Sequence, residues 1–333
     1  MKTLSEVKYS ILDLASIAQG KSIADSFHNS LDLARHAEQW GYNRYWLAEH
    51  HNLEGIASAA TSVLIGYIAG GTKSIRVGSG GIMLPNHAPL VIAEQFGTLG
   101  TLYPGRIDLG LGRAPGTDGL TMRALRRDLR REPDFGELVL ELQGYFKESY
   151  PDQKVRAIPG AGVNVPLWIL GSSLYSAQLA AYLGLPYSFA GHFAPDEMMD
   201  AIKIYRAGFQ ASEHLKKPYV MLGIQIVAAD SDQEAQRLST TMMRRFLGII
   251  RNQRVNMEPP VDSMAAYWTV AEEQLVKSRL ATSIIGGPET VIRKLQEFIN
   301  ATQADELMIV SDQYNHSDRL RSFELISQLM RKS

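Results

Sequence analysis

The chain has 333 residues, and 34 Lys and Arg stand against 35 Asp and Glu, so the formal net charge is −1 with the eight His neutral. This balance gives no electrostatic reason to expect nucleic acid or an anionic membrane as a partner. The sequence contains no Cys, which excludes disulfides, thiolate nucleophiles and Cys-ligated metal clusters. Because it shows neither a signal-peptide pattern nor an apolar run of membrane-spanning length, we expect a soluble, cytoplasmic protein.

Short apolar segments alternate with helical patterns along nearly the whole chain. Several of these segments are apolar at successive positions, which is typical of parallel strands covered on both faces. The predicted strands are residues 7–12, 44–48, 75–84, 106–111, 166–170, 187–190, 219–228 and 305–310. The predicted helices are residues 26–40, 89–102, 173–183, 196–209, 232–250, 288–301 and 317–331. Asp25 is expected to open the first of them.

Eight strands with intervening helices predict an α/β fold of the (β/α)8 barrel type, formed as a single domain by residues 1–333. A doubly wound sheet with a second domain is the alternative, but no repeat or low-complexity linker divides the chain. Two segments, 112–165 and 250–284, are longer than a single crossover needs. We expect them to hold insertions at the catalytic mouth, where they would act as lids.

Two histidines, His50 and His51, directly follow a predicted strand and are therefore expected at the C-terminal face of the barrel. Histidine is the side chain most easily poised for proton transfer near neutral pH, although a structural role for one of them is equally open. Adjacent residues at a strand end point to opposite faces, so at most one should face the mouth. For the same reason we predict no metal site here.

Glycines mark another predicted strand, at Gly78, Gly80 and Gly81. Glycine inside a strand often marks a bulge or the close approach of a flat ligand, and a tight bend at the barrel rim is an equal alternative. A dinucleotide-binding fingerprint that begins at Gly110 fails, because Pro115 stands where its third glycine belongs.

The segment from Gly171 to Ser176 joins a predicted strand to a helix and contains Ser172 and Ser173. Hydroxyls and free amides at a helix N-terminus attract a phosphate, and Arg113, at the same face of the barrel, would balance its charge. Simple capping of the helix by one of these serines is the less favoured alternative.

A cluster of basic residues follows, with a spacing that predicts one stripe along a helix. The stripe is most simply a solvated face, and holding an acidic substrate is the minority interpretation. The cluster is Arg123, Arg126, Arg127, Arg130 and Arg131, of which the first four form the predicted stripe.

Taken together, the motifs resemble those of the bacterial luciferase-like flavin-dependent monooxygenases, most closely the YhbW-type group. The resemblance covers most of the chain, and the combined set of motifs is specific although each piece is weak. The matching segments are residues 46–52, 77–99, 102–118, 168–186, 284–295 and 305–310.

This resemblance implies a barrel whose C-terminal mouth binds FMN. Gly80 and Gly81 match the pair beneath the isoalloxazine ring, which a non-prolyl cis peptide joins in the family. His50 matches the catalytic histidine and His51 a supporting one. The residues that match the phosphate-binding turn and its arginine are Gly171, Ser172, Ser173, Ser176 and Arg113.

The implied chemistry uses reduced FMN as a co-substrate, which adds O2 to form a C4a-peroxyflavin and transfers one oxygen atom to a small organic substrate. A separate NAD(P)H-dependent flavin reductase would supply the reduced flavin. Gly112 stands where light-emitting members have a cysteine, so bioluminescence is not expected. The organic substrate does not follow from the resemblance.

Two other functions remain open at this point. A deazaflavin-dependent hydride-transfer enzyme would use the same barrel without oxygen, and a flavin-binding protein without turnover would need only the binding site. Family members commonly form homodimers, and residues 58–70 are apolar nearly all round, more than one buried stripe requires. We therefore predict a homodimer.

Overall fold

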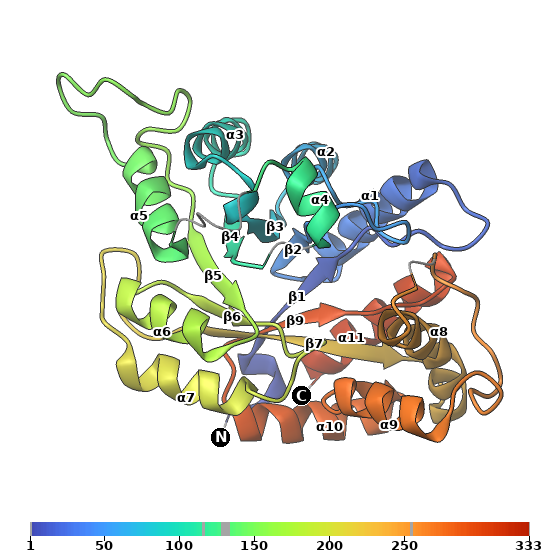
Figure 1. Cartoon of the computed structure of the whole chain (residues 1–333). Coiled ribbons are helices and arrows are strands. Elements are labelled where there is room, and N and C mark those ends of the chain that lie inside the picture. The colour runs from blue at the N-terminus through green and yellow to red at the C-terminus, as the bar shows by residue number, and fades with distance from the viewer. Residues whose placement is uncertain (1, 115–116, 128–133, 254–255, 333) are drawn as a thin grey trace.

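A computed structural model describes residues 2–114, 117–127, 134–253 and 256–332. Eight parallel strands form a closed barrel, with helices around its outside (Figure 1). The order around the ring is β6–β5–β4–β3–β2–β1–β9–β7, and β7 pairs with β6 to close it. This confirms the predicted fold class.

The barrel strands agree with the prediction to within one or two residues. They are β1 (Lys8–Asp13), β2 (Arg44–Leu47), β3 (Arg76–Met83), β4 (Ile107–Gly112), β5 (Leu167–Gly171), β6 (Tyr187–Phe189), β7 (Val220–Ala228) and β9 (Glu306–Val310). A further strand, β8 (Ile284–Gly286), pairs only with the end of β7, outside the closed ring. It has three residues, too few for a periodic pattern in the sequence.

The described residues form eleven helices, most of which cover the outer face of the strands. They are α1 (Ile23–Gln39), α2 (Thr61–Gly71), α3 (Pro89–Leu102), α4 (Gly119–Ala124), α5 (Phe135–Phe146), α6 (Leu174–Leu183), α7 (Met198–Gly208), α8 (Asp232–Ile250), α9 (Val270–Arg279), α10 (Pro288–Thr302) and α11 (His316–Lys332), with short 3₁₀ turns η1 (Leu4–Glu6) and η2 (Leu84–Asn86). None of the described helices is long and apolar enough to span a membrane.

The start of α1 differs from the prediction. Ser22 is the N-cap, and its hydroxyl accepts a hydrogen bond from the backbone N–H of Asp25. The Asp25 carboxylate bonds back to the Ser22 N–H, so the two form a capping box. Asp25 therefore lies inside the helix instead of opening it.

The predicted arginine stripe is wrong. Helix α4 ends at Ala124, and Arg126 has a positive φ of 60°, a left-handed conformation that no helix continues. Arg123 and Arg127 therefore do not share a helical face with it. Arg130 and Arg131 lie outside the described residues.

The two long segments have different roles. Residues 112–165 contain α4 and also α5, which packs beside α3 as an ordinary barrel helix. Residues 250–284 contain α9, which packs with α8 in a small apolar cluster of its own. The length of the first segment thus comes partly from a crossover helix whose periodicity the sequence analysis missed.

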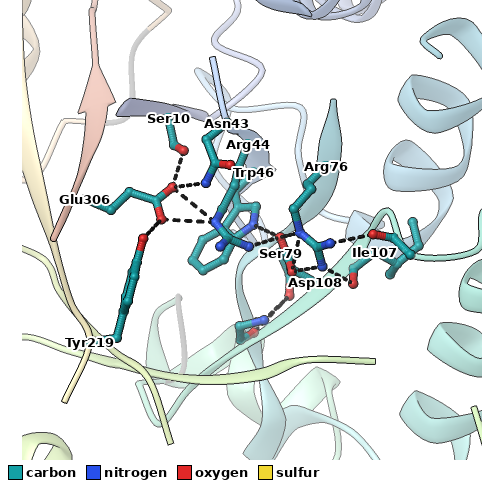
Figure 2. A network of polar contacts seen from close by, with 12 residues as sticks. Ser10, Asn43, Arg44, Trp46, Arg76, Ser79, Ile107, Asp108, Tyr219 and Glu306 are labelled. Atoms are coloured by element: carbon teal, nitrogen blue, oxygen red, sulfur yellow. Dashed lines mark hydrogen bonds and ion pairs between the residues drawn. The ribbon is translucent and has the colours of Figure 1, made fainter. Parts of the chain in front are cut away.

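A network of buried charges fills the N-terminal end of the barrel (Figure 2). Arg44 lies between two acids: its Nη1 is 2.6 Å from Asp108 Oδ2, and its Nε is 3.1 Å from Glu306 Oε1. Arg76 pairs with the other side of Asp108, and the Tyr219 hydroxyl donates to Glu306 at 2.8 Å. Two arginines thus neutralise two carboxylates that are fully shielded from water.

Candidate active site

A cavity of about 620 Å³ opens at the C-terminal ends of the strands. Its lining comes from all eight barrel strands and from the loops after several of them, as a barrel enzyme requires. No Asp or Glu lines it within the part of the chain that the structure describes, whereas Arg113, Arg127, His50 and His192 all do. The cavity therefore suits a ligand with an anionic group.

One end of the cavity is built by the turn between β5 and α6. Ser173 is the N-cap of α6, yet its hydroxyl makes no capping hydrogen bond, so simple capping does not explain it. Gly171, Ser172 and Ser173 all line the cavity beside the free amides of this helix start. The guanidinium carbon of Arg113 lies 4.5 Å from the centre of the Tyr175 ring, which holds the positive charge at the same end.

Ser176 differs from the other two serines of this turn. It is buried, and its Oγ donates to the backbone oxygen of Ser173 at 2.8 Å. Its proton is thus already engaged, and Ser176 braces the turn against Tyr187, whose hydroxyl lies 3.2 Å from the same Oγ.

The floor of the cavity is apolar and includes the predicted glycine pair. A Cβ at Gly80 would lie 2.7 Å from Leu12 Cδ1, and one at Gly81 would lie 2.7 Å from the oxygen of Gly110. The peptide between Gly80 and Gly81 is cis, and the pairing of β3 with β4 shifts register here. Glycine is thus required because the floor has no room for side chains, and the predicted bulge is present.

The structure separates the two predicted histidines. His50 lines the cavity, and its backbone N–H donates to the oxygen of Ser58 at 2.9 Å. The ring of His51 is instead turned to Glu49, whose Oε1 lies 2.8 Å from Nε2, and His51 is not part of the cavity lining. Of these two histidines, only His50 is placed to contact a ligand in the cavity directly, and His51 lies behind the lining.

Glu49 joins His51 to a third histidine. Its Oε1 also lies 2.9 Å from His87 Nε2, and its Oε2 accepts the backbone N–H of Met83 at 3.1 Å. Burial alone would raise the pKa of Glu49, but hydrogen bonds from His87, His51 and Met83 outweigh it and lower this pKa below its ordinary value.

These three side chains also offer one ligand atom each within 4.8 Å of one another. The argument against a metal at His50 and His51 does not apply to this cluster. Its N···O distances of 2.8 and 2.9 Å are those of ordinary hydrogen bonds, which account for the arrangement without a metal.

His192 is a cavity residue that the sequence analysis missed. It lies three residues after the end of β6, where its ring meets the edge of Phe193 with centroids 4.9 Å apart. Burial lowers the pKa of His192 to about 4. A histidine just beyond a predicted strand end is the signal that would have found it, the same signal that identified His50.

Within the described residues, the two long segments contribute unequally to the cavity. Met122 and Arg127 of the first segment line the cavity, but no described residue of 250–284 does. The second segment instead contacts the loops behind the lining. Thr282 Oγ1 donates a hydrogen bond to the oxygen of Gly191 at 3.1 Å, and Met257 forms an isolated β-bridge with Ala18. The predicted lid over the mouth is therefore wrong for the described part of 250–284.

Known proteins resemble this chain along nearly its whole length. A family model described as luciferase-like monooxygenase matches residues 7–305. A luciferase-like monooxygenase of Escherichia coli (strain K12) is 53% identical over 320 residues, which are 96% of each chain. The N-acetyl-S-alkylcysteine monooxygenase of Bacillus subtilis (strain 168) is 31% identical and covers 96% of this chain and 97% of its own.

Solved structures have the same fold. Apo-MsnO8 superposes with a TM-score of 0.86 at 32% identity, and the match covers 98% of this chain and 99% of that one. The oxygenating constituent of 3,6-diketocamphane monooxygenase, solved in complex with FMN, gives 0.72 at 18% identity over 98% and 99% of the two chains. An F420-dependent secondary alcohol dehydrogenase gives 0.71 at 14% identity, again over 98% and 99%. From its sequence and its barrel together, the chain belongs to the luciferase-like monooxygenase family.

Proposed function

We propose that the protein is an FMN-dependent monooxygenase of the two-component type, which takes reduced FMN from a separate NAD(P)H-dependent reductase. The main observation behind this proposal is the composition of the cavity: Arg113 and the start of α6 form a cationic end, and the backbone of Gly80 and Gly81 lines the apolar part. The FMN complex of 3,6-diketocamphane monooxygenase supports this cofactor, since it has the same fold.

When bound, reduced FMN supplies two electrons to O2, so that one oxygen atom enters the organic substrate and the other leaves as water. The protein would bind the phosphate through Arg113, Ser172 and Ser173, and the backbone of Gly80 and Gly81 would adjoin the flavin ring. His50 accepts or returns a proton beside the ring. The apolar floor excludes water that would divert the oxygen to hydrogen peroxide.

Anaerobic titration of the protein with reduced FMN, followed by mixing with oxygen, tests this function. We expect tight binding and a delay before the absorbance of oxidised FMN returns. His50→Ala should abolish the delay while the affinity for FMN stays within a few fold. Equal loss of FMN affinity would make His50 structural, and tight binding with no delay in the wild type would favour deazaflavin chemistry or a carrier role.

We also propose that the protein acts as a homodimer. Large apolar side chains are exposed on α2 and α3, where Val63 is 68% and Leu102 is 63% accessible. Val91 and Tyr67 lie on the same two helices and are also exposed. Several large exposed apolar residues on two neighbouring helices favour an interface, and a second copy of this chain would cover them.

A further inference from the structure

A second imidazole faces the cavity from the side opposite to His50. In the closed ring, β2 and β6 are separated by three strands in either direction, so the loops after them stand across the mouth from each other. His50 follows β2 and His192 follows β6, and both line the cavity. Nothing in the proposed roles of the phosphate end or the glycine floor requires a histidine here.

The position of the His192 ring is fixed by its neighbours. The ring occupies the space that a side chain at position 223 would fill, so Gly223 of β7 makes room for it. The Phe193 ring packs against it at an interplanar angle of 78°, and Thr282 holds the preceding residue through the oxygen of Gly191. A ring enclosed in this way keeps one orientation without a hydrogen bond of its own.

The enclosed nitrogen identifies the tautomer. Nδ1 of His192 is buried and has no hydrogen-bond partner among the described residues. An N–H buried without an acceptor costs more than a bare nitrogen lone pair, because protein interiors rarely leave a donor unsatisfied. The proton of the neutral ring therefore lies on Nε2, and the ring offers a donor, not an acceptor, where it lines the cavity.

The ring is uncharged at the pH of the cell. Burial is the main cause of its low pKa, and Arg245 and His50 lower it further. Asp312 raises it, but that carboxylate is already engaged by Arg245, with Nη1 2.7 Å from Oδ1. Arg245 lies on α8 and Asp312 follows β9, so the groups that face the ring come from three different elements.

We propose that His192 is a specificity residue, whose Nε2–H donates a hydrogen bond to an uncharged acceptor oxygen inside the cavity. This inference rests on the proposed function. The acceptor is uncharged because the ring carries no charge to offset the desolvation of an anion, whereas the anionic end of the ligand has Arg113. Two molecules offer such an oxygen: the flavin ring, through its carbonyls, and a carbonyl-bearing organic substrate.

Histidine NMR on the cofactor-free protein tests the tautomer and the charge. We expect the His192 imidazole, assigned by its loss in His192→Gln, to be in the Nε2–H form and to stay neutral at pH 6. His214, an exposed histidine remote from the cavity, serves as the control resonance in the same spectra. Protonation of His192 at pH 6, or an Nδ1–H tautomer, would overturn the proposal even if FMN never bound.

Binding measurements separate the two sources of the oxygen. His192→Phe removes the donor, and His192→Gln keeps an amide donor near the position of Nε2. If the flavin carbonyl is the partner, the Kd for FMN should rise about three- to tenfold in the Phe variant and return towards wild type in the Gln variant. His214→Gln should leave it unchanged.

If the substrate is the partner, the FMN affinity stays constant and the effect appears with an uncharged ketone. The FMN-loaded wild type should bind cyclohexanone about three- to tenfold more tightly than methylenecyclohexane, which lacks the oxygen, and His192→Phe should abolish this preference. Gly223→Ala displaces the same ring without altering its chemistry and should act like the Phe variant. Unchanged FMN affinity together with no ketone preference in the wild type would overturn the proposal.

Discussion

The carboxylate of Glu49 connects the ends of two neighbouring strands, because its Oε1 lies 2.9 Å from His87 Nε2 in the loop after β3. The same oxygen meets His51 at the end of β2, and the side chain is only 1% accessible. His50 lies between these bonded residues in sequence and faces the cavity. These hydrogen bonds therefore fix the position of the segment that carries His50, and the residues that make them do not contact the ligand.

Replacing Glu49 by Gln should destabilise the protein by about 1–3 kcal/mol. The amide keeps the shape of the side chain but places N–H groups opposite the histidine donors, which leaves buried donors unsatisfied. Urea unfolding would measure the change, and Glu54→Gln at an exposed position is the matched control, expected within about 0.5 kcal/mol. Equal stability of the two variants would show that the hydrogen bonds contribute nothing.

Removing the charge of Arg44 at the N-terminal end of the barrel should destabilise the protein more than Glu49→Gln does. Arg44→Met leaves Asp108 and Glu306 buried with one arginine fewer, and breaking such a buried pair costs about 3–5 kcal/mol. Arg293→Met removes an exposed helix pair with Glu297 and should change the free energy of unfolding by about 0.5 kcal/mol or less. A loss below about 1 kcal/mol in Arg44→Met would mean that water enters the network.

Arg113→Ala should weaken the binding of FMN more than the binding of riboflavin. A charge-assisted hydrogen bond to a phosphate contributes about 1.5–3 kcal/mol, so we expect the Kd of FMN to rise about ten- to a hundredfold. Riboflavin has no phosphate and should be affected by a few fold at most. Arg123→Ala, at an exposed position at the end of α4, is the control. Equal weakening of both ligands would contradict the phosphate assignment.

His192 should make the protein sensitive to mild acid. Its folded pKa of about 4 lies below the ordinary value of 6.5, so unfolding takes up a proton below pH 6.5. The stability that comes from a neutral His192 is present above pH 6.5 and is lost as the pH falls to 4, by about 1–3 kcal/mol. Unfolding of wild type and His192→Gln across this range measures it, and His214→Gln should behave as wild type. Parallel curves for all three would be incompatible with a depressed pKa.

Light scattering at micromolar concentration tests the homodimer. Val63→Asp places a charge in the exposed apolar surface of α2 and should convert a dimer to a monomer. Leu275→Asp, at a comparably exposed apolar residue on α9, should not change the mass. A monomeric wild type would refute the dimer directly.

The strand pattern and the strand-end motifs could be predicted from the sequence because they are local. The barrel strands are apolar at successive positions, Gly80 and Gly81 lie inside one such strand, and the Ser172–Ser173 turn follows the end of another. His50 carries a local signal of the same kind, because it directly follows a predicted strand. His192 carries an equivalent signal after β6, although it was not among the predicted site residues.

Other features depend on residues that are distant in the chain. Arg44, Asp108 and Glu306 are ordinary charged residues in the sequence, and they meet only because the barrel closes with β9 beside β1. The arginine stripe failed for the converse reason, since spacing alone assumes a helix that Arg126 does not continue.

By itself, the sequence determined the order of the barrel strands and of seven helices, and the motifs that place the chain in its family. These depend on local periodicity and on residue type. Only the tertiary structure decided that His50 faces the cavity while His51 turns to Glu49, that Gly223 makes room for His192, and that the cavity is lined by cationic and neutral groups. Such relationships arise when a closed sheet brings side chains from eight strands to one mouth, and no short stretch of sequence encodes a distance between strands.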